Sequence, residues 1–152
     1  MRAFRIGDPH GMYKIYSGDG AAKVEGRWHA RGQDVIYASS HYSTSLLEQL
    51  AHWNGHLPPQ QHYIEIDIPV GTSYEVVTKD TLPGWVDSSV ARAFGAKWFA
   101  DARSSILVVP SYVARLETNV LINPQHAHSN RIRCGLETPV PWDDRLFLKP
   151  GH

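Results

Sequence analysis

The stretch 26–39, GRWHARGQDVIYAS, contains two side chains whose types suit the binding of a small ligand. Arg27 lies between a glycine and a tryptophan, where a guanidinium can be held rigid and aimed at an anionic group. Tyr37 closes a short apolar run and offers an aromatic face. A carboxylate, Glu48, follows in the next segment. The ordinary alternative for Arg27 is a solvent-exposed surface position, and spacing alone does not decide between the two.

The segment 43–53 is predicted to be the helix that positions Glu48, with Ser43 as its N-cap. Its apolar residues recur at helical spacing: Leu46, Leu47, Leu50 and Trp53. Glu48 falls almost opposite this stripe, beside Thr44, Ser45 and His52. Such a position is typical of a solvated helix face, but it also suits a face that lines a cleft.

The remaining pattern predicts an α+β fold, because strands outnumber helices and do not alternate regularly with them. A second helix is expected over 86–102, with Asp87 as its cap. Gly55 and the prolines of 57–59 are expected to end the first helix. The predicted strands cover 33–39, 62–69, 104–112, 117–124 and, as an edge strand, 145–150.

Length and composition favour one domain spanning residues 1–152. The 15 basic and 15 acidic residues balance, which argues against a general nucleic-acid binder, since such proteins carry a basic excess. Cys134 is the only cysteine, so no internal disulfide can form. With no signal-peptide pattern and no apolar run of membrane-spanning length, we expect a cytoplasmic protein that does not enter a membrane.

Three further groups of residues carry a chemical interpretation beside an ordinary one. The segment 17–23, SGDGAAK, is similar to a phosphate-binding glycine loop but lacks the helix that must follow it, so it indicates a turn. The nine histidines, with the pairs His52/His56 and His126/His128, raise the question of a metal site. Their spacing favours surface and capping roles, and we expect no metal.

Ser111 in VVPSY is the third of these groups. A nucleophilic serine needs an elbow motif such as GxSxG or partners implied by spacing, and neither is present. The ordinary interpretation is a strand end at which the hydroxyl satisfies a nearby backbone group.

Residues 26–53, followed by LVVPSYVARLETNVLINPQHAH at 107–128, resemble the RES domain, the toxin half of bacterial RES–Xre toxin–antitoxin pairs. The resemblance runs from about residue 5 to about residue 148. The domain's name refers to an arginine, a glutamate and a serine, which match Arg27, Glu48 and Ser111. Further matches are Tyr37 in VIYAS, Asn119, and the NPQH turn that ends at His126.

Two positions depart from the family pattern. His29 stands where the family more often has asparagine after the RW pair, and Ala127 stands where a proline usually follows the histidine of the NPxH turn. Both lie beside motif residues rather than on them. They therefore bear on substrate details more than on the assignment.

The resemblance implies a fold like that of ADP-ribosyltransferases, with mixed or antiparallel sheets around an NAD⁺-binding cleft and flanking helices. It implies the toxin of a type II toxin–antitoxin system that cleaves the nicotinamide–ribose bond of NAD⁺. Water, phosphate or a target protein could accept the ADP-ribose, and the sequence does not choose among them. The implied partner is an Xre-type helix-turn-helix antitoxin, which covers the cleft and itself contacts DNA.

Each motif residue has an expected role in that chemistry. Arg27 would grip the pyrophosphate, Tyr37 would hold the nicotinamide, and Glu48 would stabilise the oxocarbenium-like ribose. Ser111 would donate a hydrogen bond to the substrate, while Asn119 and His126 would shape the rim of the pocket. The leaving nicotinamide is neutral, so no metal is needed. Two other functions stay open: a ribonuclease toxin, and a non-catalytic subunit of a repressor complex.

Overall fold

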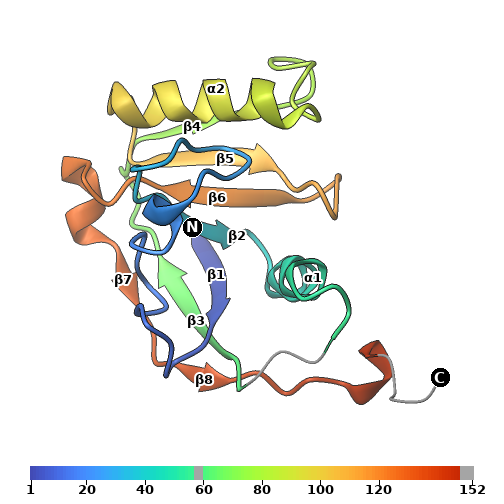
Figure 1. Cartoon of the computed structure of the whole chain (residues 1–152). Helices are drawn as coiled ribbons and strands as arrows, with labels where there is room; N and C mark the ends of the chain where they lie inside the picture. Colours follow the sequence, from blue (N-terminus) through green and yellow to red (C-terminus); the bar gives the residue numbers. More distant parts are fainter. Residues whose placement is uncertain (57–59, 148–152) are drawn as a thin grey trace.

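In the computed structural model, which describes residues 1–56 and 60–147, one mixed sheet runs through the molecule (Figure 1). Its strand order is β4-β5-β6-β2-β1-β3-β7, and β8 pairs with β3. All pairs are antiparallel except β4 with β5. The strands are β1 (Arg2–Gly7), β2 (Ile36–Ser39), β3 (His62–Asp67), β4 (Tyr74–Val76), β5 (Ile106–Pro110), β6 (Thr118–Ile122), β7 (Arg133–Cys134) and β8 (Thr138–Pro139).

Two α-helices of the described chain flank this sheet at different places. The helix α2 (Ser88–Ala100) lies along the part formed by β4, β5 and β6, whereas α1 (Tyr42–His52) packs against β1 and β2 (Figure 1). Short 3₁₀ helices occupy Ala21–Lys23, Ala127–Arg131 and Asp144–Leu146. No helix among the residues described is both long and apolar enough to cross a membrane.

Alternating side chains of the central strands supply two hydrophobic clusters. In β5, Ile106 belongs to one cluster and Leu107 to the other, as the two-residue period of a strand requires. The first cluster joins β5 and β6 to β1, β2 and β3 through Ile36, Ile64, Ile66, Val120 and Ile122. The second packs α2 and the segment around Trp28 against Leu107, Val109 and Leu121, with Trp98 fully buried. Strands β2 and β6, which carry Tyr37 and Asn119, are thus packed on both faces.

The α+β prediction is confirmed, and several elements form where the pattern placed them. Asp87 caps α2, because its side chain accepts a hydrogen bond from the Ser89 amide. The predicted strands 33–39, 62–69, 104–112 and 117–124 are each present but shorter. The N-terminal strand β1 and the short strands β4, β7 and β8 were not predicted. Arginines interrupt the apolar pattern of β1, and the three residues of β4 are too few to show a period.

Other expectations are wrong. The first helix begins at Tyr42 with His41 as N-cap, whereas Ser43 was the predicted N-cap. No edge strand forms over 145–147, because the Asp143 side chain accepts from the Arg145 amide and starts a 3₁₀ helix. Residues 148–150 of that prediction, and the prolines of 57–59, lie outside the described residues.

The orientation of α1 also differs from the apolar-stripe interpretation. Its buried residues are Thr44 and Ser45, which lie on the polar face, while Leu47 of the apolar stripe is 47% exposed. The helix therefore turns its polar side toward the sheet. That orientation carries Glu48 toward the interior rather than toward bulk solvent.

Candidate active site

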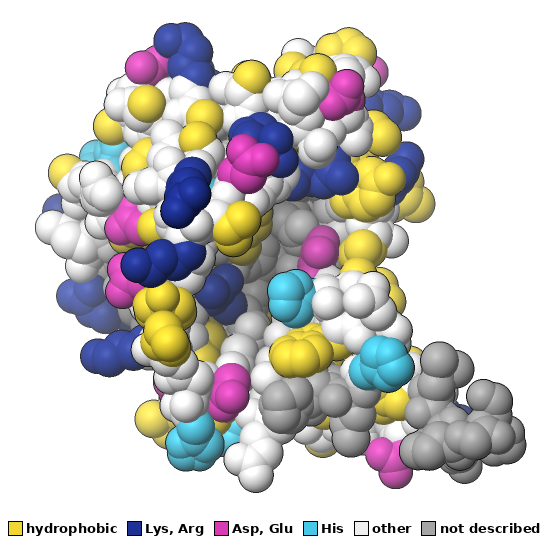
Figure 2. All heavy atoms as spheres, viewed as in Figure 1, with side chains coloured by type: hydrophobic (Ala, Val, Ile, Leu, Met, Phe, Trp, Pro, Cys, Tyr) yellow, Lys and Arg dark blue, Asp and Glu magenta, His cyan; other side chains and the backbone are white. Residues whose placement is uncertain are grey.

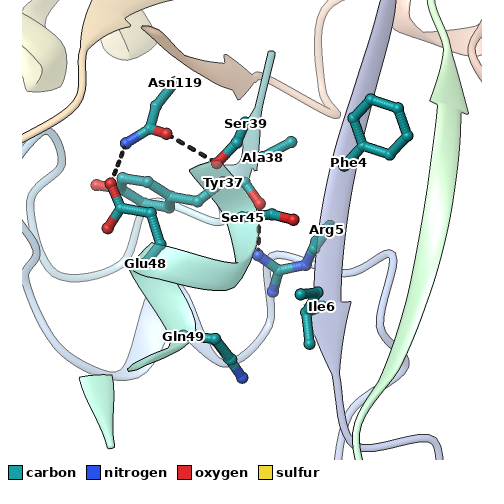
Figure 3. Close-up of a pocket in the computed structure, with 10 residues that line it drawn as sticks. All are labelled: Phe4, Arg5, Ile6, Tyr37, Ala38, Ser39, Ser45, Glu48, Gln49 and Asn119. Atoms are coloured by element: carbon teal, nitrogen blue, oxygen red, sulfur yellow. Dashed lines mark hydrogen bonds between the residues drawn. The ribbon is translucent and has the colours of Figure 1, made fainter. Parts of the chain in front are cut away.

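Four polar side chains from separate elements form one hydrogen-bonded chain around Glu48. Its Oε1 accepts from Ser111 Oγ at 2.8 Å and from Asn119 Nδ2 at 2.7 Å. Asn119 Oδ1 in turn accepts from Ser39 Oγ at 2.9 Å, as Figure 3 shows. Ser39 and Asn119 lie directly opposite each other in the β2–β6 pair. The structure thus brings three of the predicted residues, Glu48, Ser111 and Asn119, into direct contact.

The Glu48 carboxylate lies at the wall of a cavity of about 120 Å³ between α1 and strands β1, β2 and β6. Tyr37 lines the same cavity, so a fourth predicted residue belongs to this place. The lining side chains are Phe4, Arg5, Ile6, Tyr37, Ala38, Ser39, Ser45, Glu48, Gln49 and Asn119 (Figure 3). Whole-ligand pockets measure roughly 300–1,000 Å³. A cavity of this size therefore admits one end of a dinucleotide and not the whole.

Arg5 is a charged residue of this cavity that the sequence reasoning missed, as it also missed Ser39. Its guanidinium donates to the backbone oxygens of Ile15 at 2.5 Å, Tyr37 at 2.7 Å and Ser17 at 3.5 Å. Burial lowers the pKa of Arg5 to about 10. Within the described parts of the chain, no carboxylate forms an ion pair with it. Three backbone carbonyls hold this partly buried guanidinium at the cavity, where its positive charge would attract an anionic ligand.

A buried histidine holds the hydroxyl of Tyr37. His29 Nδ1 lies 2.6 Å from Tyr37 Oη. His29 Nε2 lies 2.8 Å from the carbonyl oxygen of Ala21 and 3.0 Å from that of Val24. Because two carbonyls face Nε2, that nitrogen carries the proton and Nδ1 accepts from the tyrosine. The Trp28 amide donates to the same hydroxyl at 3.2 Å.

These contacts hold the Tyr37 hydroxyl and so fix the position of the ring, which lines the cavity. Burial raises the pKa of Tyr37, while the Trp28 amide and the charges of Arg92 and Arg27 act in the opposite direction. The hydroxyl therefore stays protonated at neutral pH. What the residue offers to a ligand is its ring.

Two glycines let the segment around Arg27 pack closely. A Cβ added to Gly26 would lie 2.5 Å from His29 Cε1 and 3.1 Å from the Tyr37 hydroxyl. One added to Gly95 of α2 would lie 1.8 Å from the Trp28 carbonyl oxygen. Such distances are far below a van der Waals contact, so neither position admits a side chain without movement.

Arg27 itself is held at the edge of the site, and it does not line the cavity of Glu48. Its Nη1 donates to the oxygens of Val86 at 3.0 Å and Trp85 at 3.5 Å, and its guanidinium lies 4.0 Å from the ring centroid of Tyr112. Tyr112 directly follows Ser111. The guanidinium and the carboxylate are therefore joined through two consecutive residues of the β5–β6 connection.

His126 is the one predicted site residue that the structure does not bring to this place. It follows the far end of β6, whereas Asn119 lies near the beginning of that strand. Its side chain accepts from the amide of His128 and caps the 3₁₀ helix Ala127–Arg131. The capping position explains this histidine without a ligand.

The other chemical interpretations can be compared with the structure. The turn predicted over 17–23 leads into a 3₁₀ helix at Ala21–Lys23, and no α-helix follows it. Ser111 Oγ bonds to Glu48 and accepts from the Ala114 amide, a pattern that is not that of a nucleophile paired with a histidine. Over residues 1–56 and 60–147, no three histidine, cysteine or acidic side chains are grouped so as to hold a metal.

Comparisons with known proteins identify the family to which this sequence is similar. Residues 2–143 match the profile of the RES domain. The "Prs ADP-ribosylating toxin" of a Sphingobium species is 36% identical over 140 residues, covering 88% of this chain and 87% of that protein. "Toxin Res" of Pseudomonas putida is 31% identical over 139 residues, covering 89% and 94%, respectively.

A solved structure shares the fold. It is the toxin–antitoxin complex MbcT–MbcA of M. tuberculosis, with a TM-score of 0.68 at 15% identity over 91% of this chain and 83% of the solved one. At that identity the likeness concerns the fold alone. The family match, in contrast, covers nearly the whole sequence, and this chain therefore belongs to the RES domain family.

Proposed function

We propose that this chain is the toxin of a type II toxin–antitoxin system and that it consumes NAD⁺ by cleaving the bond between nicotinamide and ribose. One observation carries the proposal: Glu48 is held by Ser111 and Asn119 at the wall of a cavity that Tyr37 also lines. The names of its relatives, one of them an ADP-ribosylating toxin, support it.

Glu48 would act on the ribose. Cleavage of the glycosidic bond gives an oxocarbenium-like sugar, and a carboxylate beside it lowers the barrier. Both hydrogen bonds to Glu48 fall on Oε1, so the carboxylate is oriented while Oε2 can face the sugar. Preorganised electrostatic groups of this kind contribute on the order of 3 kcal/mol to the barrier. The leaving group is neutral nicotinamide, which needs no strong acid.

The remaining residues would bind the substrate. The ring of Tyr37, fixed by His29, would stack on the nicotinamide, an interaction worth about 1–3 kcal/mol for a base on an aromatic side chain. Arg27 would bind the pyrophosphate at the edge of the cavity, where Tyr112 and two carbonyls hold it. Arg5 adds a second guanidinium, inside the cavity.

The proposal extends to the acceptor, the partner and the compartment. The acceptor of ADP-ribose is water, phosphate or a protein, and the name of the Sphingobium relative favours a protein. The partner is an Xre-type antitoxin, which supplies any contact with DNA. We also propose that residues 1–152 form one domain, which is supported by the pairing of β1 and β8 with β3 in the same sheet. The toxin would act in the cytoplasm, on cellular NAD⁺.

The test is to incubate the purified chain, without antitoxin, with NAD⁺ and to measure the release of nicotinamide by chromatography. Glu48→Gln should lose a hundredfold or more of the rate, about 3 kcal/mol. Glu137→Gln, a change at an exposed glutamate, should retain it. The proposal fails if the wild-type chain releases no nicotinamide, or if Glu48→Gln is as active as wild type.

Labelled NAD⁺ added to a cell lysate separates the acceptors, because a labelled protein band indicates transfer and its absence favours degradation. Total RNA extracted after induction should stay intact while NAD⁺ falls. Degraded RNA with unchanged NAD⁺ would instead support the ribonuclease alternative.

A further inference from the structure

The turn between β5 and β6 carries a cluster of two arginines and two aromatic rings. The ring of Tyr112 lies 4.0 Å from the guanidinium of Arg27 and 4.6 Å from that of Arg115. Trp85 belongs to the same cluster. Its ring centroid lies 6.4 Å from that of Tyr112 and 5.8 Å from the Arg115 guanidinium. Figure 2 shows Lys/Arg and hydrophobic side chains on the right of the molecule, where Figure 1 places the turn between β5 and β6.

The two positive charges of this cluster are held mainly by backbone oxygens. Asp87 lies within electrostatic reach of Arg27: hydrogen bonds from Ser89, and to a smaller extent the charge of Arg27, lower the pKa of its carboxyl. Arg27 donates to backbone oxygens, and Arg115 Nε donates to the oxygen of Tyr112 at 3.3 Å. In residues 1–56 and 60–147, neither forms an ion pair with an acidic side chain. Two cations on one ring repel each other. An anion with more than one charge would relieve that repulsion and bind both guanidiniums.

A hollow of about 440 Å³ adjoins this cluster. Its wall is largely apolar, with Trp85, Val86, Pro110 and Leu116, and it carries three charged side chains, Lys79, Arg115 and Glu117. Val86 also accepts the hydrogen bond from Arg27, so the hollow begins where that guanidinium is held. An aromatic and apolar wall beside a guanidinium suits a nucleobase, because every base has a face that can stack.

The cluster is continuous with the Glu48 site. Ser111, which donates to Glu48 at 2.8 Å, is followed directly by Tyr112. A ligand with its ribose at Glu48 would extend along these two residues to the arginines and then to the hollow. That order, from a ribose to two anionic groups to a base, is the order of groups in a dinucleotide.

We propose that Arg27, Tyr112, Arg115 and the hollow beside Trp85 form the site for the adenosine diphosphate half of the substrate. Arg115 is then the residue that selects a dinucleotide over nicotinamide mononucleotide, which lacks this half. The inference rests on the proposed function, because it takes NAD⁺ as the ligand. It adds a residue that none of the motifs contains.

Calorimetric titration with ADP and with nicotinamide mononucleotide tests the assignment, using the full chain in a Glu48→Gln background so that it can be produced without antitoxin. Arg115→Ala should weaken the binding of ADP about tenfold and leave that of the mononucleotide unchanged. Arg115→Lys should weaken it less, since charge remains but the planar fork is lost. Arg145→Ala is the matched control, because Arg145 is an exposed arginine paired with Asp143, and it should change neither.

Three results would overturn the proposal: no binding of ADP to the background protein, an unchanged ADP affinity in Arg115→Ala, or equal losses for both ligands. Nicotinamide release by the chain with native Glu48 is measured separately. If that release occurs while Arg115→Ala binds ADP normally, the enzyme assignment stands and this subsite is rejected. If ADP binds as expected while no nicotinamide is released, the subsite stands as an ADP site and the proposed reaction is rejected.

Discussion

Ser111 Oγ donates a hydrogen bond of 2.8 Å to Glu48 Oε1 across 63 residues of sequence. Ser111 follows β5, and Glu48 lies in the second half of α1. Its hydroxyl is already engaged by a carboxylate and by the Ala114 amide. The serine is therefore placed to orient Glu48, and its expected role as a direct donor to the substrate becomes secondary in the proposed mechanism.

Replacement of Ser111 by alanine should lower the rate of nicotinamide release. Hydrogen bonds to charged groups contribute about 1.5–3 kcal/mol, which corresponds to a loss of about ten- to a hundredfold in kcat/KM. The variant Ser105→Ala is a control, because Ser105 is also fully buried but bonds to Ser129, away from the cavity. Steady-state kinetics and thermal melting of both variants give the answer. A Ser111→Ala protein that is less stable but as active as Ser105→Ala would contradict the orienting role.

The contact between His29 and Tyr37 should contribute measurably to stability. His29→Leu leaves the tyrosine hydroxyl and the carbonyls of Ala21 and Val24 without this partner, at a cost on the order of 2 kcal/mol in the free energy of unfolding. His29→Asn keeps an amide that can restore part of the network, so its loss should be smaller. Urea unfolding measures both, with exposed His10→Leu as the control. Equal stability of the leucine and asparagine variants would contradict this account.

The dependence of stability on pH should reveal the buried tyrosines. Burial raises the pKa of Tyr37, and that of Tyr16 to about 12, from the ordinary value of 10.0. Above pH 10 the unfolded chain releases these protons before the folded chain does, so the free energy of unfolding must fall as pH rises further. Burial lowers the pKa of Arg5 to about 10, which acts in the opposite direction.

The comparison of wild type with Tyr37→Phe isolates one of these groups. The variant should lose less stability between pH 10 and pH 12, because it no longer has the hydroxyl that must ionise. Chemical unfolding at a series of pH values measures the difference. Parallel curves for the two proteins would show that Tyr37 titrates as it does in the unfolded chain.

Gly95→Ala should destabilise the protein although alanine is the better helix former. The added Cβ would lie 1.8 Å from the Trp28 oxygen, so α2 and the segment that carries Arg27 must separate. Overpacking of this kind costs about 1–3 kcal/mol, more than the helix propensity gained. Gly135→Ala is the matched control, since its nearest neighbour is 3.7 Å away. If the two variants have the same melting temperature, the close approach of Gly95 to the Trp28 carbonyl is contradicted.

Much of the fold could be predicted because its signals are local. The Asp87 cap and the alternation of Ile64 and Ile66 depend on neighbours within a few residues, and the structure confirms the elements they mark. Where the local signal misled, a distant contact prevailed. The polar face of α1, with Thr44 and Ser45, is buried because the helix packs against β1 and β2, which the spacing of leucines cannot reveal.

The sequence by itself determined the residue types and their order: a guanidinium after Gly26, a tyrosine, a carboxylate on a helix, then Ser111 and Asn119 on the last central strands. Only the tertiary structure decided which of them meet. It joined Glu48 to Ser111 and Asn119, added Arg5, held Arg27 on Tyr112 and left His126 at the other end of β6. The reason is physical: hydrogen bonds and burial act across space between strands that pair, and sequence spacing records only the contacts within one element.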